Sequence, residues 1–418
     1  MHIDAGRLWK RVEELSRFTD PQRPWTRRAF TPLHLQSREW LAESMRAAGL
    51  EVWLDEAGNL IGRREGRNNL PPLVTGSHCD TVVDGGRFDG IIGVLAGLEI
   101  AQAMDEAGVR LEHPFEVIDF LSEEPSDYGI SCVGSRGMVG LLDADMLASS
   151  NPEGERLAQG MRRIGARPEH LGTPLRRPGS IAAFVELHIE QGPVLETRGL
   201  PVGVVSHIVG IRRVALTVQG RPDHAGTTPM DLRQDALVGA ARLIEAVNRR
   251  ASAMAGNPHY VVATVGRIDM SPNVPNAVPG RVDMVLEVRS DSVDVLATFV
   301  EEVLETCSSS LQELRVKAGM RELSRSTPTA CDQQVMDVIG EAAAALNYPY
   351  TILPSGAGHD AAYMARLGPM GMVFIPCKGG RSHCPEEWIE PEQLLAGTRV
   401  LAETLRRLDG EIRSDSRR

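Results

Sequence analysis

The chain of 418 residues has few cysteines and no excess of positive charge. Its six cysteines show no Cys-x-x-Cys spacing and are sparse for this length, which fits reduced thiols in the cytoplasm. The formal net charge of −11 speaks against nucleic acid or an anionic membrane as partner, because both are bound through basic patches. The sequence has no apolar run of membrane-spanning length, and residues 1–20 lack the apolar core of a secretory signal.

What is present is the composition of a globular protein, with 42% hydrophobic and 24% charged residues. The length favours two or three domains. Both ends of the chain alternate between strand-like and helical patterns, which predicts an α/β domain. The predicted strands are 73–75, 115–121, 181–189 and 371–376, with a hairpin over 51–63. The predicted helices are 4–18, 32–48, 90–104, 331–346, 360–367 and 391–408.

The pattern of apolar and polar residues changes between residues 210 and 324. Apolar and polar residues alternate at 211–219, 259–268 and 281–289, and helical patterns cover 233–255 and 292–316. The order β-α-β-β-α predicts two helices on an antiparallel sheet, inserted as a separate α+β domain. The predicted division is therefore a catalytic domain of 1–209 and 325–418 with an inserted domain of 210–324.

Histidines and carboxylates follow the predicted strands of the α/β domain. In the stretch 72–99, a histidine and an aspartate come directly after a strand, and a second aspartate follows a glycine-rich turn. Of the other predicted strands, one is followed by a Glu-Glu pair, one ends in a histidine, and one is followed by a histidine after a loop. These residues are His78, Asp80, Asp89, Glu123, Glu124, His188 and His383. If the strands are parallel neighbours, the side chains converge at one sheet edge, where open α/β sheets bind ligands. Such a set suits Zn²⁺, or Mn²⁺ and Co²⁺ at a more oxygen-rich site.

Each of these residues also has a plainer interpretation. An isolated histidine is usually structural, a Glu-Glu pair is usually a solvated turn, and the glycines at 85 and 86 are expected in any tight turn. Cys79 and Cys384 adjoin candidate histidines, but an alternating strand would turn them to the other face. The recurrence of such residues after one strand after another favours the metal site.

Several motifs together resemble a known family. They are GSHCDTVVDGGRFDGIIGVLAGLE (76–99), Glu123-Glu124, ELHIEQGPVLE (186–196), GRPDHAGTTPM (220–230), SPNVPNAVPG (271–280), EVRS (287–290), SGAGHDA (355–361) and RSHCPEE (381–387). In this order, over residues 72 to 390, they resemble the hydantoinase/carbamoylase branch of the M20 metallopeptidase-like amidohydrolases. That branch includes N-carbamoyl-L-amino-acid hydrolases, β-ureidopropionases and allantoate amidohydrolases. The resemblance implies an α/β catalytic domain with a mixed sheet and a dinuclear metal centre, and an inserted lid and dimerisation domain.

The resemblance also implies roles for the residues of the centre. It implies two divalent ions per subunit, with zinc expected and manganese, cobalt or nickel as alternatives. His78 and His188 would bind one ion, Glu124 and His383 the other, and Asp89 would bridge them. Asp80 would orient His78, and Glu123 would be the general base that takes a proton from water and passes it to the leaving nitrogen.

Further residues are implied to bind the substrate. His224 and Asn276 would stabilise the oxyanion, and Arg289 would hold a substrate carboxylate, all three reaching the site from the other subunit of a homodimer. Gln191 and the backbone at Gly358 would complete the pocket. The plainer interpretation of Arg289, which the resemblance does not favour, is an exposed charge on a strand.

One segment departs from the family pattern. After the Glu pair, members usually continue with another acidic residue, a glycine and an Arg-Phe step, whereas this chain continues with PSDYGISCV (125–133). The expected reaction is hydrolysis of an N-carbamoyl-L-amino acid to the amino acid, CO₂ and ammonia. The departure keeps open an allantoate-type or other amide or amine aminohydrolase acting on a small carboxylate. A catalytically silent binding protein of the same fold is a further alternative, which the intact ligand set speaks against.

Overall fold

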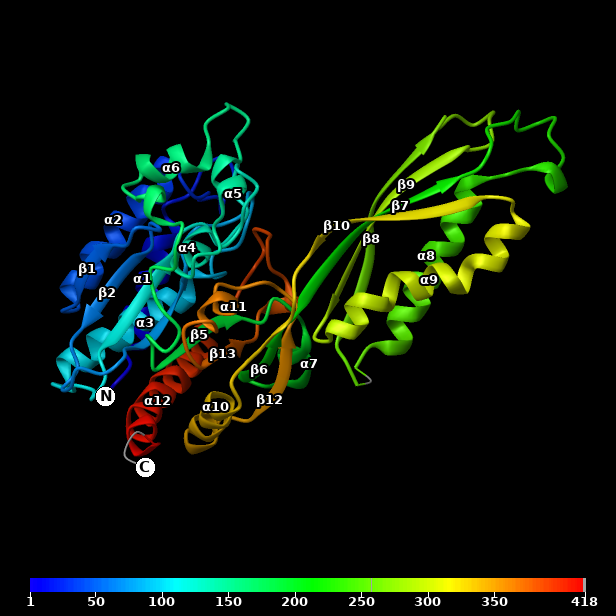
Figure 1. Cartoon of the computed structure of the whole chain (residues 1–418). Coiled ribbons are helices and arrows are strands. Elements are labelled where there is room, and N and C mark those ends of the chain that lie inside the picture. The colour runs from blue at the N-terminus through cyan, green and yellow to red at the C-terminus, as the bar shows by residue number, and fades with distance from the viewer. Residues whose placement is uncertain (257, 416–418) are drawn as a thin grey trace. The chain divides into compact units, whose positions relative to one another are not determined.

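The computed structural model of the chain describes residues 1–256 and 258–415. It divides into two compact units (Figure 1). The first contains Met1–Ser206, Cys331–Leu353 and the chain from Gly358 onward, and the second contains His207–Ala330 and Pro354–Ala357. Among the described residues, no helix combines the length and the apolar character needed to cross a membrane. All six cysteines are unpaired.

The first unit is built on a mixed sheet. The strands are β1 (Glu51–Leu54), β2 (Leu60–Arg64), β3 (Leu73–His78), β4 (Phe115–Phe120), β5 (Ala183–Ile189), β6 (Val202–Ile208), β11 (Thr329–Ala330), β12 (Tyr350–Ser355) and β13 (Met370–Ile375). Their order is β1-β2-β4-β3-β5-β13-β6-β11, and β12 pairs with β6. The central strands β4, β3, β5 and β13 are parallel neighbours. Strands β1 and β2 run antiparallel to their partners, and β6 runs antiparallel to β13 and β11. The predicted α/β class with a mixed sheet is confirmed.

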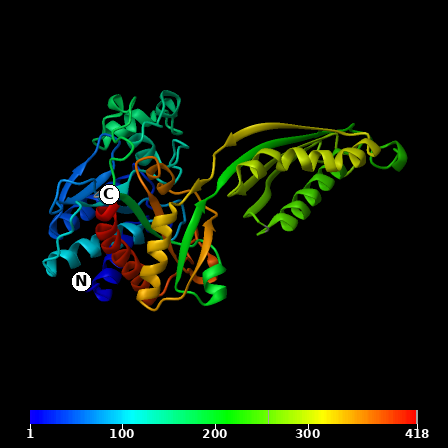
Figure 2. The ribbon, with the colours of Figure 1, turned by 60° about the horizontal axis from the view of Figure 1, so that its bottom comes forward.

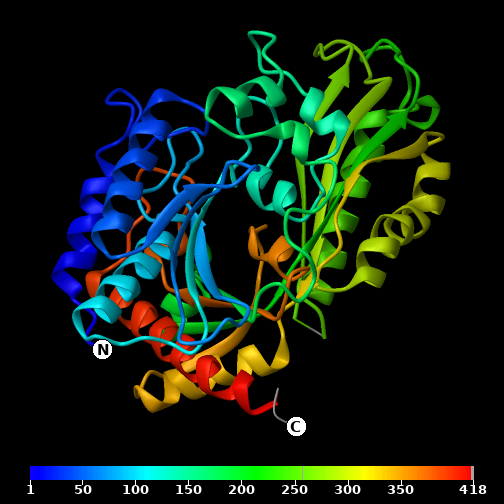
Figure 3. The ribbon, with the colours of Figure 1, turned by 60° about the vertical axis from the view of Figure 1, so that its left-hand side comes forward.

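Helices cover this sheet. They are α1 (Ala5–Ser16), α2 (Pro32–Ala47), α3 (Ile91–Glu106), α4 (Val133–Met138), α5 (Ala144–Ala148), α6 (Leu157–Arg163), α7 (Val194–Arg198), α10 (Gln333–Ala345), α11 (Ala361–Met364) and α12 (Pro391–Asp415), with short 3₁₀ turns η1 (Pro168–His170) and η3 (Lys378–Gly380). Helix α3 packs on β3 and β5 and touches α1 and α12, and α10 and α12 lie side by side (Figure 3).

Helix α3 lies unusually close to the sheet because of two glycines. A Cβ at Gly93 would lie 2.5 Å from the Leu187 carbonyl oxygen, and one at Gly97 would lie 2.8 Å from Thr75 Cγ2. Thirteen of the helix's residues are buried, which explains why its apolar residues occur on all sides. The close fit fixes the start of α3, and with it Asp89 two residues upstream, against the end of β3.

The second unit is a four-stranded antiparallel sheet with helices on one face (Figures 1 and 2). The strands are β7 (Gly210–Gln219), β8 (Val261–Ser271), β9 (Arg281–Ser290) and β10 (Lys317–Arg325), in the order β10-β7-β9-β8, and the helices are α8 (Ala236–Met254) and α9 (Val293–Glu313), with a 3₁₀ turn η2 (Met230–Leu232). Leu216, Leu243, Leu286 and Phe299 lie in the core between the sheet and the helices. The predicted order β-α-β-β-α omitted β10, because this edge strand is exposed along almost its whole length and has no apolar alternation.

A buried ion pair joins α2 to β4 and allows a test of the packing. Arg38 Nε lies 2.7 Å from Asp119 Oδ2, and the side chains are 6% and 0% exposed. Arg38→Ala should lower the free energy of unfolding by about 3–5 kcal/mol, because a buried carboxylate then loses its counter-ion. Urea unfolding followed by tryptophan fluorescence measures this loss. Arg23→Ala, which breaks an exposed pair with Asp84, should leave the midpoint almost unchanged, and equal losses in both variants would contradict the interpretation.

Candidate active site

The carboxyl ends of the parallel strands bring the predicted side chains of the first unit together. His78 is the last residue of β3, and His188 is the penultimate residue of β5. Glu123 and Glu124 follow β4, and His383 follows β13 after a loop. Because β4, β3, β5 and β13 are parallel neighbours, these ends meet at one edge of the sheet.

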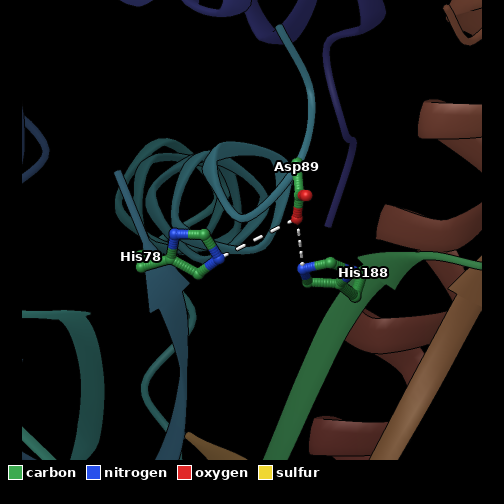
Figure 4. Close-up of side chains that lie close together, drawn as sticks. All are labelled: His78, Asp89 and His188. Carbon is green, nitrogen blue, oxygen red and sulfur yellow. Dashed lines mark ion pairs between the residues drawn. The ribbon is translucent and has the colours of Figure 1, made fainter. Parts of the chain in front are cut away.

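Asp89 lies at the centre of the cluster, and its two oxygens face different groups. Asp89 Oδ1 lies 3.0 Å from His188 Nε2 and 3.9 Å from His78 Nε2 (Figure 4). Asp89 Oδ2 lies 2.9 Å from His383 Nε2, which is also 2.9 Å from Glu124 Oε1. Two groups of side chains that could hold a metal ion, the two candidate ligand groups, therefore share Asp89: His78, Asp89 and His188, and Asp89, Glu124 and His383.

Backbone carbonyl groups orient two of the imidazoles. His78 Nδ1 lies 3.0 Å from the Asp80 carbonyl oxygen, and His188 Nδ1 lies 2.9 Å from the Ile189 carbonyl oxygen. A carbonyl oxygen can only accept, so Nδ1 carries the hydrogen in both rings. In the neutral imidazole, Nε2 then presents its lone pair toward Asp89, as a metal ligand must.

Asp80 is completely buried, and its side chain binds the backbone of Glu123 and Glu124. Its two carboxylate oxygens accept the backbone N–H groups of Glu123 and Glu124, at 3.3 and 3.1 Å. Its Oδ1 lies 3.7 Å from His78 Nδ1, so the orienting contact to that ring comes from the Asp80 backbone instead. Burial raises the pKa of the Asp80 carboxyl to about 7. The expected orientation of His78 by the side chain therefore stays a prediction, and the Asp80 carboxylate holds the Glu123-Glu124 backbone in place.

Glu123 lies beside the two candidate ligand groups that share Asp89. Its Oε2 is 3.7 Å from His78 Nε2, and its Oε1 accepts a hydrogen bond from Cys132 Sγ at 3.6 Å. Burial raises the pKa of the Glu123 carboxyl well above its ordinary value. The contact with Cys132 was missed by the sequence reasoning, although Cys132 belongs to the departing segment 125–133 and that departure was the available signal.

The charges of the cluster compensate one another. Burial acts to raise the pKa of Asp89, but hydrogen bonds from His188 and His383 hold it well below its ordinary value. The same hydrogen bonds to Asp89 and Glu124 raise the pKa of His383 to about 11. For His78, burial favours the neutral ring, yet the carboxylates of Glu123, Asp80 and Asp89 raise its pKa to about 10. The closely spaced buried carboxylates thus favour positively charged groups at this edge of the sheet.

Gln191 adjoins the same carboxylate. It has a positive φ of 54°, and its Nε2 donates to Asp89 Oδ2 at 2.9 Å. Its Oε1 is buried without a hydrogen-bond partner among the described residues. Gly358 begins the segment that leads into α11, and a Cβ there would meet open space, so packing does not require this glycine.

The remaining predicted residues lie in the second unit. His224 Nδ1 accepts the backbone N–H groups of Gly226 and Thr227 at 3.0 and 3.2 Å, so its Nε2 carries the hydrogen. The Asn276 carbonyl accepts the Ala225 N–H at 3.0 Å, and His224 forms an isolated bridge with Ala277. His224 and Asn276 are therefore close neighbours.

Arg289 lies on β9. Its Nη1 donates to the Gly356 carbonyl at 2.6 Å, and its Nε donates to Glu287 Oε1 at 2.7 Å. The side chain is 30% exposed, so this charge is half-buried and held in place instead of being freely solvated.

Comparisons with known proteins show the family to which the chain belongs. Residues 74–407 match the family described as Peptidase family M20/M25/M40. The chain is 40% identical over 407 residues to N-carbamoyl-L-amino-acid amidohydrolase of Paenarthrobacter aurescens, covering 97% of this chain and 98% of that protein. It is 33% identical over 382 residues to allantoate amidohydrolase of Bacillus subtilis strain 168, covering 90% and 92%. The crystal structure of an amidase of the hydantoinase/carbamoylase family from Burkholderia multivorans superposes with a TM-score of 0.89 at 35% identity, covering 97% and 98%.

The protein is a metal-dependent hydrolase by its fold and site: an α/β fold with a mixed sheet carries histidine and carboxylate groups at the carboxyl edge of that sheet. The chain belongs to peptidase family M20/M25/M40. It is an enzyme that hydrolyses C–N bonds other than peptide bonds, as its amidohydrolase relatives do. The predicted family and enzyme class are confirmed.

The Asp80 contacts predict a local effect on the Glu pair. In Asp80→Ala, the N–H groups of Glu123 and Glu124 lose their acceptors, so their amide hydrogens should exchange roughly tenfold faster. Hydrogen exchange with peptide-level mass spectrometry measures this. Asp127→Ala removes an exposed carboxylate that pairs with Arg28, and it serves as the control. Equal exchange rates in both variants would show that Asp80 does not hold this backbone.

Proposed function

We propose that the enzyme hydrolyses the ureido C–N bond of an N-carbamoyl-L-amino acid and releases the amino acid, CO₂ and ammonia. The observation that carries this proposal is the likeness to an N-carbamoyl-L-amino-acid amidohydrolase, at 40% identity over 97% of the chain. The intact set of histidines and carboxylates around Asp89 supports it, because hydrolysis of an unactivated ureido bond needs strong activation of water.

The donor set at Asp89 fits divalent metal ions. Imidazole Nε2 atoms and carboxylate oxygens converge there, and the carboxylates raise the pKa of His383. The buried amide oxygen of Gln191 has no hydrogen-bond partner in the described part of the chain. We therefore propose two ions per subunit: His78 and His188 would hold one, Glu124 and His383 the other, and Asp89 both. Zinc suits this set, with manganese, cobalt or nickel as alternatives. When bound, the ions would supply Lewis acidity that activates water and polarises the ureido carbonyl.

Glu123 is the proposed general base. Its Oε2 lies 3.7 Å from His78 Nε2. Burial raises the pKa of its carboxyl, so the carboxylate is a stronger base that would take a proton from water and deliver it to the leaving nitrogen. The Cys132 thiol holds its other oxygen, Oε1, and so leaves Oε2 for the reaction.

The substrate would be held by polar groups of both units. The Nε2–H of His224 and the amide of Asn276 would donate to the oxyanion, and Arg289 would bind the substrate carboxylate through two parallel hydrogen bonds. Gln191 and the backbone at Gly358 would line the pocket. We propose that the three second-unit residues act in the site of a partner subunit, which makes the protein a homodimer. A cytoplasmic location is also proposed, supported by the six unpaired cysteines.

A substrate panel tests the proposed reaction. Enzyme loaded with Zn²⁺ or Mn²⁺ is given N-carbamoyl-L-amino acids, their D enantiomers and allantoate, and ammonia release is measured. We expect the highest kcat/KM for an N-carbamoyl-L-amino acid. A higher value for allantoate would favour the second candidate, which the likeness to the Bacillus subtilis enzyme supports. Ammonia from none of these compounds would overturn the proposed substrate class.

The roles assigned to the Glu pair predict different losses. Glu123→Gln should keep the metal and lower kcat by roughly 10²–10⁴-fold, because the amide cannot accept the proton. Glu124→Gln should lose metal, since it removes a proposed ligand. Metal analysis combined with the ammonia assay separates the two effects. Loss of metal in Glu123→Gln, with retention in Glu124→Gln, would mean that the two roles are reversed.

The proposed carboxylate clamp predicts an effect on affinity. Arg289→Ala should raise KM by roughly tenfold to a hundredfold while kcat changes less, because the substrate loses a charge-assisted bidentate partner. Arg213→Ala is the matched control: Arg213 lies on the neighbouring strand β7 and pairs with Glu287, as Arg289 does. Steady-state kinetics should leave this control within about twofold of the wild type. Unchanged kinetics in Arg289→Ala would remove Arg289 from the site.

A further inference from the structure

A buried carboxylate outside the two ligand groups joins the two loops that form the centre. Glu387 lies in the loop between β13 and α12 and is 1% exposed. Its Oε1 accepts the backbone N–H groups of Phe88 and Asp89, at 2.8 and 3.0 Å. Its Oε2 lies 2.7 Å from Ser382 Oγ. One side chain thus connects the glycine-rich turn before α3 to the loop that carries His383.

The turn is shaped to receive this carboxylate. An ideal Cβ at Gly86 would lie 1.9 Å from Glu387 Cδ, so any other residue at this position would displace the Glu387 side chain. Gly86 does not have a positive φ, and backbone conformation therefore does not explain the glycine. Gly86 instead provides the space that the Glu387 carboxylate occupies.

Ser382 extends the contact to the Asp89 side chain. Its Oγ lies 3.0 Å from Asp89 Oδ2, the oxygen that also faces His383. Glu387 therefore contacts Asp89 directly at the backbone N–H. Ser382 Oγ lies between the two carboxylates and can donate its single hydrogen to one of them at a time. Together with the Gln191 hydrogen bond, these contacts fix both the position and the rotation of the Asp89 side chain.

We propose that Glu387 is a positioning residue, which holds the Asp89 carboxylate in the orientation that presents one oxygen to each ligand group. The inference rests on the proposed function, because it assigns to Asp89 a place between two ions. A carboxylate that follows a turn with two adjacent glycines has no rigid helix or strand of its own to orient it. Contacts of this kind beyond the ligands typically change metal affinity by 10- to 100-fold.

The proposal differs from two simpler roles for Glu387. If Glu387 were itself a ligand, its negative charge would be required, and glutamine could not replace it. If it only braced the loop, its removal would lower stability without a specific effect on metal binding. As a positioning residue it needs hydrogen bonding alone, since a glutamine can offer Oε1 to the two N–H groups and donate from Nε2 to Ser382.

Competition titration of Zn²⁺ against a chromophoric chelator tests the proposal without reference to substrate. Glu387→Ala should bind Zn²⁺ roughly 10- to 100-fold more weakly than the wild type, and Glu387→Gln should stay within about threefold. Tight binding by Glu387→Ala would overturn the positioning role. Weakening of Glu387→Gln to the level of Glu387→Ala would overturn it as well, in favour of a ligand.

Two further variants keep the test decisive if Glu387→Ala does not fold. Ser382→Ala removes the hydroxyl contacts to Asp89 Oδ2, Glu387 Oε2 and Gln191 Nε2. It leaves the contacts of Glu387 Oε1 to the two backbone N–H groups, and it should weaken Zn²⁺ binding several-fold, with unchanged circular dichroism. Gly86→Ala should weaken it at least as much by displacing Glu387, whereas Gly85→Ala, whose Cβ would meet its nearest neighbours at 3.1 Å, is the matched control. Wild-type affinity in both Ser382→Ala and Gly86→Ala would overturn the inference.

The outcomes distinguish this inference from the proposed function. If the wild type binds Zn²⁺ tightly and Glu387→Ala binds it equally well, the inference fails and the proposed centre stands. If the wild type binds Zn²⁺ but releases no ammonia from N-carbamoyl-L-amino acids, the substrate assignment fails and the affinity losses still report on Glu387. Absence of Zn²⁺, Mn²⁺ and Co²⁺ binding by the wild type would overturn the centre and the role of Glu387 with it.

Discussion

The arrangement of the candidate active site depends on the contacts of the Asp89 carboxylate. Asp89 is 5% exposed, and its two oxygens face imidazoles from different strands and loops. The parallel strands β3 and β5 deliver His78 and His188 to one side of it, and the segments after β4 and β13 deliver Glu124 and His383 to the other. The close packing of α3 on β3, which Gly93 and Gly97 permit, fixes where Asp89 can lie.

Buried carboxylates at this edge are held by backbone N–H groups. Asp80 accepts those of Glu123 and Glu124, and Glu387 accepts those of Phe88 and Asp89. Such contacts offset the cost of burying charge and leave few orientations open to the side chains. The acids and the proposed ligands are therefore oriented by the fold, and the reacting groups need little rearrangement when the substrate binds.

The sequence allowed the buried strands β3, β4, β5 and β13 and the gathering of the site to be predicted, because apolar runs followed by histidines or acids are visible in one dimension. The largely buried strand β6 was not predicted. Strand β10 has no buried residue, and β12 has only two, so neither strand shows the alternation of apolar and polar residues that would predict it. Glu387 and Ser382 could not be assigned a role, since their partner Asp89 lies almost 300 residues away and only the fold brings them together. The Cys132 contact to Glu123 depends on a turn with φ of 53° at Cys132, which the sequence does not encode by a glycine.

We propose that Asp89 lies between two metal ions. Anomalous diffraction from crystals grown with Zn²⁺, recorded above and below the zinc absorption edge, would locate these ions. We expect two peaks on opposite sides of the Asp89 carboxylate, each about 2.0–2.2 Å from one of its oxygens. One peak should lie against His78 and His188 and the other against Glu124 and His383. A single peak, or a pair of which only one contacts Asp89, would show that Asp89 does not bridge two ions.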